Sequence, residues 1–205
     1  MNGTLTDVHG LKVGHHTDLI NATGCTVIIA DDGAVPGVDV RGAAPGTRET
    51  DLIRAENTIE KINAIVLSGG SAFGLDSASG VMKYLAEKKI GHFVGKHVIP
   101  IVPSAIIFDL NIGSGSVKPN ATNGYFAASM ASSEPVAQGN VGAGTGATVG
   151  KALGINNAMK GGLGSYSMDL GGGVVLAALT VVNSVGGVHD WKDGKLLAGP
   201  LAAGG

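Results

Sequence analysis

The segment at residues 64–77 constrains the fold more than any other part of the sequence. Its first four residues are apolar, and a Ser-Gly-Gly-Ser turn follows at residues 68–71. Beyond the turn, apolar side chains recur at the three- and four-residue spacing of an amphipathic helix that ends near Gly91. A buried strand, a glycine turn and a helix in this order are typical of α/β proteins, so we predict an α/β fold.

Composition indicates how the core of such a fold is built. Aromatic residues make up only 4% of the chain, hydrophobic residues 44%, and glycine occurs 35 times. We therefore expect a core of Val, Ile, Leu and Ala, with backbones that approach closely at glycine. In one domain, 205 residues bury about 70% of the surface that the unfolded chain exposes, so we expect residues 1–205 to form a single domain.

Periodicity and turn residues predict the remaining elements. The predicted strands are residues 11–14, 25–30, 35–40, 64–67, 99–110 (interrupted by Pro103) and 174–182, the last as a central strand. The predicted helices are residues 47–62, the segment that ends near Gly91, and 125–133, with a loop at 113–123 and one or two helical turns at 152–159. Asp193 and Gly194 predict a hairpin turn within residues 189–197.

Charge and hydropathy exclude several classes of partner. The net charge is −2, and scattered Lys and Arg form no basic stripe, so we expect no nucleic-acid partner. No segment reaches the roughly 18 consecutive apolar residues of a membrane span, and the amino terminus lacks a basic segment followed by an apolar one. We expect no membrane association and take a reducing cytoplasm as the default location.

Cysteine and histidine give no sign of a metal site. The single cysteine, Cys25, excludes an internal disulfide and a zinc site with two thiolates, and its apolar surroundings predict a core position. His15 and His16 are adjacent, so on a strand they point to opposite faces, and we interpret them as a polar surface pair. We therefore predict no metal.

Ser71 lies on a strand-to-helix turn, where two interpretations remain open. A nucleophile elbow requires Gly-x-Ser-x-Gly, but Phe73 occupies the position of the second glycine. Ser71 can instead cap the following helix. As a nucleophile it would pair with Asp109 and His189, which follow it in Ser, Asp, His order.

The glycine-rich segment at residues 141–151 matches nucleotide-binding motifs poorly. Gly142, Gly144 and Ala147 have the spacing of a dinucleotide fingerprint, yet the motif needs a preceding strand and an acid about 20 residues further on. A phosphate loop fails because Thr145 and Ala152 occupy two of its required positions. We therefore predict no nucleotide cofactor.

Lys151 and Asn183 are the two polar residues whose positions suggest chemistry. Lys151 follows a run of small residues, so partial burial would lower its pKa and let it polarise or deprotonate a neighbour; a solvated surface lysine is the equal alternative. Asn183 ends a long apolar run. Because a buried unpaired amide costs about 1–3 kcal/mol, an Asn at the strand end is better suited to donate to a developing oxyanion.

Six motifs over nearly the whole chain resemble the L-aminopeptidase/D-esterase family, which includes β-aminopeptidases and 6-aminohexanoate-oligomer (nylon oligomer) hydrolases. The motifs are Val-Pro-Gly-Val-Asp-Val-Arg-Gly at 35–42, Pro-Gly-Thr-Arg-Glu-Thr-Asp-Leu at 45–52, Leu-Ser-Gly-Gly-Ser-Ala-Phe-Gly-Leu at 67–75, Ile-Val-Pro at 101–103 with Ile-Phe-Asp-Leu at 107–110, Val-Gly-Ala-Gly-Thr-Gly-Ala-Thr-Val-Gly-Lys at 141–151, and Lys-Gly-Gly-Leu-Gly-Ser at 160–165.

This resemblance implies a four-layer α/β/β/α sandwich of the self-processing aminopeptidase and ornithine acetyltransferase-like type. It implies a precursor that cuts itself into a large and a small subunit, of which this chain resembles the large one. The nucleophile would be the amino-terminal Ser or Thr of the small subunit, with its own amine as base. The family further implies a tetramer of such heterodimers.

The resemblance also assigns roles to individual residues. Asn183 resembles the family's oxyanion Asn, Lys151 resembles the lysine near the nucleophile, and Phe73 and Phe108 are candidates for lining the substrate cleft. The implied activity is hydrolysis of an amide in a small peptide or oligoamide through an acyl-enzyme, without metal or cofactor. The alternatives are a serine hydrolase that uses Ser71 and a non-catalytic glycine-rich binding or scaffold protein.

Overall fold

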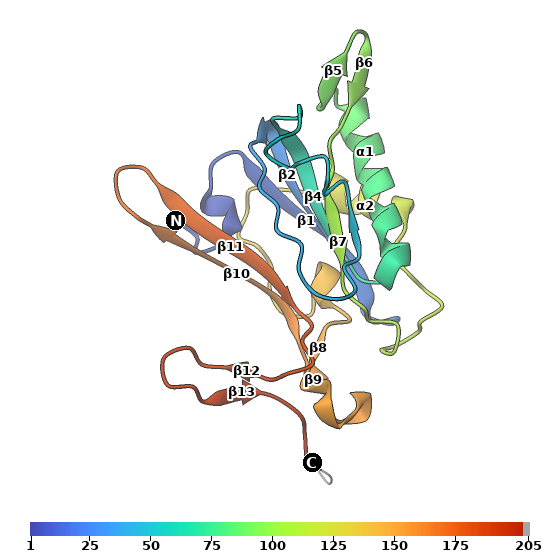
Figure 1. Cartoon of the computed structure of the whole chain (residues 1–205), viewed down its shortest axis with the longest axis vertical. Helices are drawn as coiled ribbons and strands as arrows, with labels where there is room; N and C mark the ends of the chain where they lie inside the picture. The colour runs from blue at the N-terminus through green and yellow to red at the C-terminus, as the bar shows by residue number, and fades with distance from the viewer. Residues whose placement is uncertain (203–205) are drawn as a thin grey trace.

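A five-stranded mixed sheet in the order β1-β2-β4-β7-β3 forms the centre of the computed structural model, which describes residues 1–202 (Figure 1). Strands β1 and β2 are antiparallel, as are β2 and β4; β7 runs parallel to β4, and β3 closes the edge antiparallel to β7. The bounds are β1 Leu11–Asp18, β2 Thr23–Ala34, β3 Thr47–Arg48, β4 Ile62–Ser68 and β7 Ser104–Ile106.

Helices α1 (Ser77–Glu87) and α2 (Ala121–Ser129) cover one face of this sheet (Figure 1). Alternate side chains of β2 and β4 point toward the helices and are buried with them, as their period of two requires. This main core consists of Cys25, Val27, Ile29, Ala64, Val66, Ala78, Val81, Leu85, Val102, Ala127 and Ala128. The core is aliphatic, as predicted, and the predicted core position of Cys25 is confirmed.

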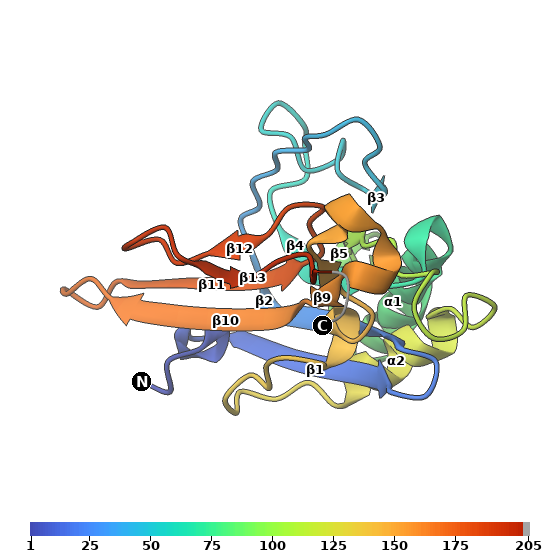
Figure 2. The ribbon, with the colours of Figure 1, turned by 90° about the horizontal axis from the view of Figure 1, so that it is seen from below.

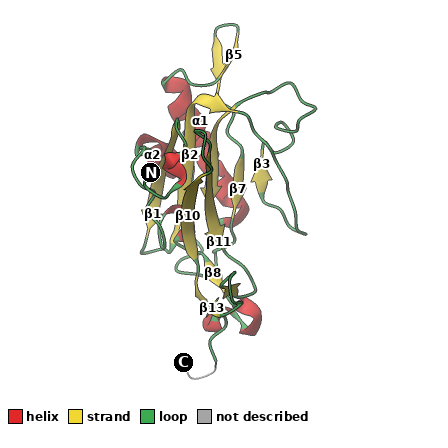
Figure 3. Cartoon of the chain, turned by 90° about the vertical axis from the view of Figure 1, so that its left-hand side faces the viewer, coloured by secondary structure: helices red, strands yellow, loops and turns green. Residues whose placement is uncertain are grey.

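The hairpin of β10 (Gly162–Asp169) and β11 (Val175–Val182) covers part of the opposite face (Figure 3). Its Leu163 packs with Val13 and Ile28, which are side chains of β1 and β2 on the face turned away from the helices. The described residues therefore form three layers: helices, central sheet and hairpin. The predicted strand at 174–182 corresponds to β11, but it is not central: within residues 1–202 it pairs with β10 alone, in this outer layer.

Shorter hairpins extend from both ends of the molecule. Strands β5 (His92–Val94) and β6 (His97–Ile99) project at one end, and β12 (Val188–His189) and β13 (Leu196–Ala198) at the other (Figure 1). The latter confirm the hairpin predicted around Asp193. Two-residue strands β8 (Thr148–Val149) and β9 (Met159–Lys160) pair near the base of β10 and β11. Within residues 1–202, no helix has the length and apolarity needed to cross a membrane.

The helix predicted at residues 47–62 is wrong. Thr47 and Arg48 pair with β7, Glu49 has a positive φ of 60°, and turns follow up to β4. The apolar side chains that suggested a helix pack from this irregular loop instead, as Ile53 does with Ile62 and Ile101. Figure 2 shows the loop arching away from the sheets.

Other predicted boundaries also change. Residues 35–40 are irregular because the strand β2 ends at Ala34 before the Pro-Gly pair, and only Ser104–Ile106 of the region 99–110 pairs as β7. The helix predicted at 125–133 begins earlier, at Ala121, because Asn120 and Asn123 form a reciprocal capping box; the predicted loop 113–123 ends accordingly. The turns predicted at 152–159 are the 3-10 turns Lys151–Leu153 and Ile155–Asn157.

Candidate active site

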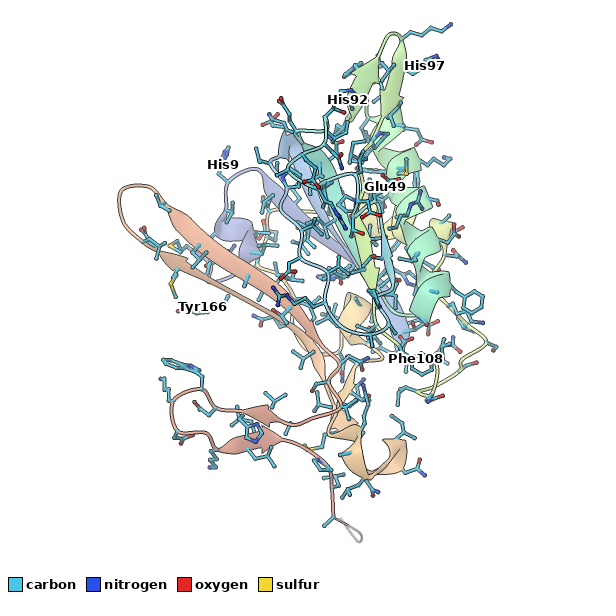
Figure 4. All side chains as sticks on the ribbon, in the orientation of Figure 1. His9, Glu49, His92, His97, Phe108 and Tyr166 are labelled. Atoms are coloured by element: carbon cyan, nitrogen blue, oxygen red, sulfur yellow. The ribbon has the colours of Figure 1, made fainter. Side chains whose placement is uncertain are left out.

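Residues from three distant parts of the chain meet at one end of the sheets. Asn183 directly follows β11, Lys151 begins a 3-10 turn after β8, and Phe108 lies just beyond β7. Figure 4 shows Phe108 at the lower end of the central sheet, opposite the hairpin that carries His92 and His97. Backbone hydrogen bonds from Gly150 N to Gly186 O and from Lys151 N to Val185 O join two of these segments.

The side chain of Asn183 has three hydrogen-bond partners from those segments. Its Oδ1 accepts from the Thr148 backbone N at 3.0 Å and from Lys151 Nζ at 2.7 Å. Its Nδ2 donates to the Phe108 carbonyl oxygen at 3.1 Å. Because a backbone N–H can only donate, the Thr148 contact fixes which side of the amide is oxygen.

Lys151 is partly buried against Asn183. Its Nζ donates to the backbone carbonyl of Asn183 at 2.9 Å as well as to the side-chain oxygen. Burial lowers the pKa of Lys151 below its ordinary value. The structure thus brings together the two residues for which the sequence predicts catalytic roles.

Within residues 1–202, one N–H of the Asn183 amide has no hydrogen-bond partner. An amide nitrogen has two N–H donors, and one of them is directed at Phe108. The other can donate to an oxyanion that forms beside the end of β11, and the partners on Oδ1 hold it in a fixed direction. A prearranged donor of this kind stabilises the tetrahedral intermediate of acyl transfer.

The two aromatic candidates, Phe73 and Phe108, lie on neighbouring segments. Both are exposed, and Lys118 Nζ lies 4.7 Å from the centre of the Phe73 ring. Ser71 N donates to the Ile107 carbonyl at 3.1 Å, so the turn that leads to Phe73 contacts the strand end that leads to Phe108. Exposed rings at this position are available to a substrate; their role in lining a cleft stays a prediction.

Two further charged residues lie in this region: Asp109, which the sequence offered only as a partner of Ser71, and Lys160, to which it gave no role. Asp109 is only 3% exposed, and its carboxylate accepts from Thr23 Oγ1 at 2.8 Å and from Gly70 N at 2.6 Å. Lys160 Nζ donates to the carbonyls of Thr145 and Ala147 at 2.6 and 2.9 Å. Burial lowers the pKa of Lys160, while the negative charge of Asp109 opposes this shift. The available signal in the sequence was the place of both residues in the motifs at 107–110 and 160–165.

Ser71 does not occupy the position expected of a helix cap. Gly70 precedes the 3-10 helix Ser71–Asp76, no side chain caps that helix, and Ser71 has a positive φ of 54°. The predicted N-cap is wrong because that role requires an extended backbone. Within residues 1–202, no hydrogen bond connects Ser71, Asp109 and His189, and His189 lies exposed on β12.

The histidine pair and the cysteine have structural surroundings. His15 and His16 do point to opposite faces, toward Thr26 and Asn123, but both are half-buried, so the surface prediction is wrong. Burial raises the pKa of the Cys25 thiol to about 12, which keeps it unreactive. In the described part of the chain, no three His, Cys, Asp or Glu side chains are grouped to hold a metal ion.

The chain matches one known peptidase family over almost its whole length. The model of peptidase family S58 matches residues 3–199. The chain belongs to peptidase family S58. The six motifs that suggested self-processing aminopeptidases lie within the matched range, and the predicted family is confirmed.

Curated relatives of this S58 chain include aminopeptidases and oligoamide hydrolases. An uncharacterized aminopeptidase of Mycobacterium tuberculosis is 44% identical over 195 residues, which cover 91% of this chain and 54% of the relative. A 6-aminohexanoate-oligomer endohydrolase of Paenarthrobacter ureafaciens is 32% identical over 186 residues, 90% of this chain and 49% of that enzyme. The S58 chain therefore spans about half the length of these relatives.

Solved structures show the same fold. A β-aminopeptidase of Burkholderia sp. superposes with a TM-score of 0.64 at 25% identity, over 89% of this chain and 52% of that one. The L-aminopeptidase D-Ala-esterase/amidase of Ochrobactrum anthropi gives a TM-score of 0.69 at 20% identity, over 89% and 53%. The latter structure is described as a variant of the Ntn hydrolase fold, which confirms the predicted fold class for this S58 chain.

Proposed function

We propose that this chain is the large subunit of a self-processing amidohydrolase whose nucleophile is the amino-terminal Ser or Thr of a small subunit from the same precursor. The observation that carries the proposal is the Asn183 amide. It is held by Lys151, Thr148 and Phe108, and its second N–H has no partner among the described residues. S58 membership and relatives about twice as long as this chain support it.

The proposed reaction is acyl transfer in which the Asn183 amide is the oxyanion donor. The hydroxyl of the small subunit attacks the amide carbonyl carbon, and its proton moves to the subunit's own amine. The free N–H of Asn183 stabilises the oxyanion, and Lys151 keeps the amide in place. The amine returns the proton to the leaving nitrogen as the carbon–nitrogen bond breaks. Water then hydrolyses the acyl-enzyme ester and releases the acid.

The face of the central sheet that is turned away from the helices favours the proposal of a partner chain. Within residues 1–202, β11 pairs only with β10, so its other edge is free. An apolar groove of about 450 Å³ lies alongside, and its lining includes Ile65, Leu67 and Leu179. Ser104 also lines it, and its buried Oγ has no hydrogen-bond partner in the described part of the chain. We propose that the small subunit adds strands to β11 and fills this groove.

We also propose how the enzyme assembles, which substrates it hydrolyses and in which compartment it lies. Four such heterodimers form the enzyme, and its substrates are small peptides or ω-amide oligomers, the two chemistries named among the S58 relatives. Phe73 and Phe108 contact the apolar part of the substrate. A free buried Cys25 suits a reducing compartment, so we place the enzyme in the cytoplasm.

The test is steady-state hydrolysis of aminoacyl p-nitroanilides and 6-aminohexanoate oligomers by the full-length protein. Asn183→Ala is expected to lower kcat by about 10²- to 10³-fold, the loss typical of one oxyanion donor. Asn156→Ala is the matched control, because Asn156 is exposed on the neighbouring 3-10 turn. An Asn183→Ala enzyme with nearly normal kcat would contradict the proposal.

The same assay separates the serine hydrolase alternative. Ser71→Ala is expected to retain most of the activity, because no hydrogen bond connects Ser71 to a histidine within residues 1–202. Complete loss of activity in Ser71→Ala with intact folding would favour Ser71 as the nucleophile. A wild-type protein without activity on any amide would favour a binding or scaffold role.

A further inference from the structure

Asp109 is the most deeply buried carboxylate beside the candidate active site, and the reaction proposed above does not use it. Its side chain is 3% exposed. Oδ2 accepts from Thr23 Oγ1 at 2.8 Å at the start of β2, and Oδ1 accepts from Gly70 N at 2.6 Å in the turn after β4. One carboxylate therefore joins three segments at the end of the sheet.

Both glycine-rich motifs leave room for this carboxylate. A Cβ added at Gly69 or at Gly146 would overlap Asp109 Oδ2. Gly69 belongs to the turn at residues 68–71 and Gly146 to the segment at residues 141–151. The sequence left a nucleophile elbow open for the first segment and argued against a nucleotide loop in the second. The structure shows that a glycine from each segment lies against Asp109.

Asp109 is adjacent in the chain to the residue that holds Asn183. The Phe108 carbonyl accepts from Asn183 Nδ2, and its direction depends on the backbone on either side. On the preceding side, Ile107 N donates to Ser68 O and Ser71 N donates to Ile107 O. On the following side, the Asp109 side chain accepts hydrogen bonds from Thr23 Oγ1 and Gly70 N, which hold the backbone there.

Lys160 completes the surroundings of the carboxylate. Its ammonium bonds the carbonyls of Thr145 and Ala147, which flank Gly146, and its charge interacts favourably with Asp109. Strand β8 follows directly and supplies Thr148, whose N–H donates to Asn183 Oδ1. The carboxylate thus adjoins Phe108 in the chain and approaches Gly146, two residues before Thr148, so it neighbours both segments that orient the Asn183 amide.

We propose that Asp109 is a positioning residue for the oxyanion donor: its buried carboxylate fixes the backbone at Phe108, and through that carbonyl it directs the free N–H of Asn183. This inference rests on the proposed function. It assigns a role to Asp109 without contact to the substrate, so its loss should lower kcat and leave KM nearly unchanged.

The experiment is a double-mutant cycle between Asp109→Asn and Asn183→Ala in the full-length enzyme. Asp109→Asn keeps the volume and can still accept from Gly70 N, but it removes the charge and one acceptor. We expect kcat to fall by about 10- to 100-fold with KM within about 3-fold, as for a slightly misplaced catalytic group. In the Asn183→Ala background, Asp109→Asn should cost little more, since the group that it positions is gone.

Two results of the cycle would overturn the inference: an unchanged kcat in Asp109→Asn, or losses that multiply in the double variant. Multiplied losses would mean that Asp109 acts independently of Asn183. If Asn183→Ala alone left kcat unchanged, the oxyanion role itself would be wrong, which separates failure of the proposed function from failure of the positioning role.

Further variants separate positioning from folding. Asn63→Ala removes a buried side chain whose Oδ1 accepts from Ile101 N in another part of the sheet, so it should lower the melting temperature without lowering kcat.

A second variant is available if Asp109→Asn does not fold. Thr23→Val removes one hydrogen bond to the Asp109 carboxylate and leaves its charge. We expect Thr23→Val to lower kcat about 5-fold in the wild type and hardly at all in Asn183→Ala; an unchanged kcat would overturn the role.

Discussion

The hydrogen bonds of Asn183 hold its side-chain amide in one orientation before any substrate binds, as the proposed oxyanion role requires. Its oxygen accepts from Thr148 N and Lys151 Nζ, and its nitrogen donates to Phe108 O. Because these partners already define the direction of the remaining N–H, little reorganisation is needed when charge develops on a substrate. The position of Asn183 at a strand end was predictable from the sequence. Its partners were not, because Phe108 lies 75 residues away in the chain.

The partly buried imidazoles of His15 and His16 make the stability of the fold depend on pH. Burial lowers the pKa of both imidazoles from the ordinary value of 6.5, with Asp18 partly opposing this at His16. Below about pH 6.5 the unfolded chain therefore binds protons that the folded chain does not, and stability falls as the pH falls toward the lowered pKa values.

The check is the melting temperature of the assembled enzyme at pH 7 and pH 5. We expect His15→Asn with His16→Gln to reduce the difference between the two temperatures relative to the wild type. An equal or larger difference in the double variant would contradict the assigned cause.

At the scale of elements, prediction succeeded where local pattern and tertiary pairing agree. The run at residues 64–67 and its glycine turn gave β4 correctly, and the apolar run at 174–182 gave β11. The helix predicted at residues 47–62 was wrong, although its apolar side chains have a helical spacing. Thr47 pairs with β7 and Glu49 has a positive φ, and both features are incompatible with a helix there. Neither constraint is visible in local periodicity.

The close approach of α1 and α2 depends on glycine. A Cβ at Gly80 would overlap the Ala121 carbonyl oxygen of the facing segment. Gly80→Ala in an exposed helix would stabilise it by about 1 kcal/mol, but here overpacking should dominate and destabilise the protein by about 1–3 kcal/mol. Thermal and urea unfolding measure this change.

Gly37→Ala is the control, because Gly37 has open space around its Cβ position and no positive φ. It should change stability by less than about 0.5 kcal/mol. A Gly80→Ala protein as stable as the wild type would show that the two helices are free to separate.

For the whole molecule, the uncovered side of the central sheet is the main structural consequence of the fold. The helices cover one face, and the β10–β11 hairpin covers only part of the other (Figure 3). The remaining part includes Ile65, which is 38% exposed, beside the edge of β11 that pairs with no other described strand. An apolar surface next to an unpaired strand edge is suited to a partner that adds strands.

Ile65→Asp tests this surface in the full-length precursor. A charge in the groove should weaken docking, so we expect unprocessed precursor or subunits that separate on size-exclusion chromatography. Met130→Asp is the control, since Met130 is 58% exposed at the end of α2 in the helical layer. Normal processing and assembly of Ile65→Asp would exclude the groove as the docking surface.

We propose that this chain forms one half of a self-processed enzyme. Denaturing intact-mass analysis of the purified native protein tests this proposal. We predict two polypeptides, one that contains this sequence and a smaller one whose first residue is Ser or Thr. A single unprocessed polypeptide in an active preparation would contradict the mechanism and would direct attention back to Ser71.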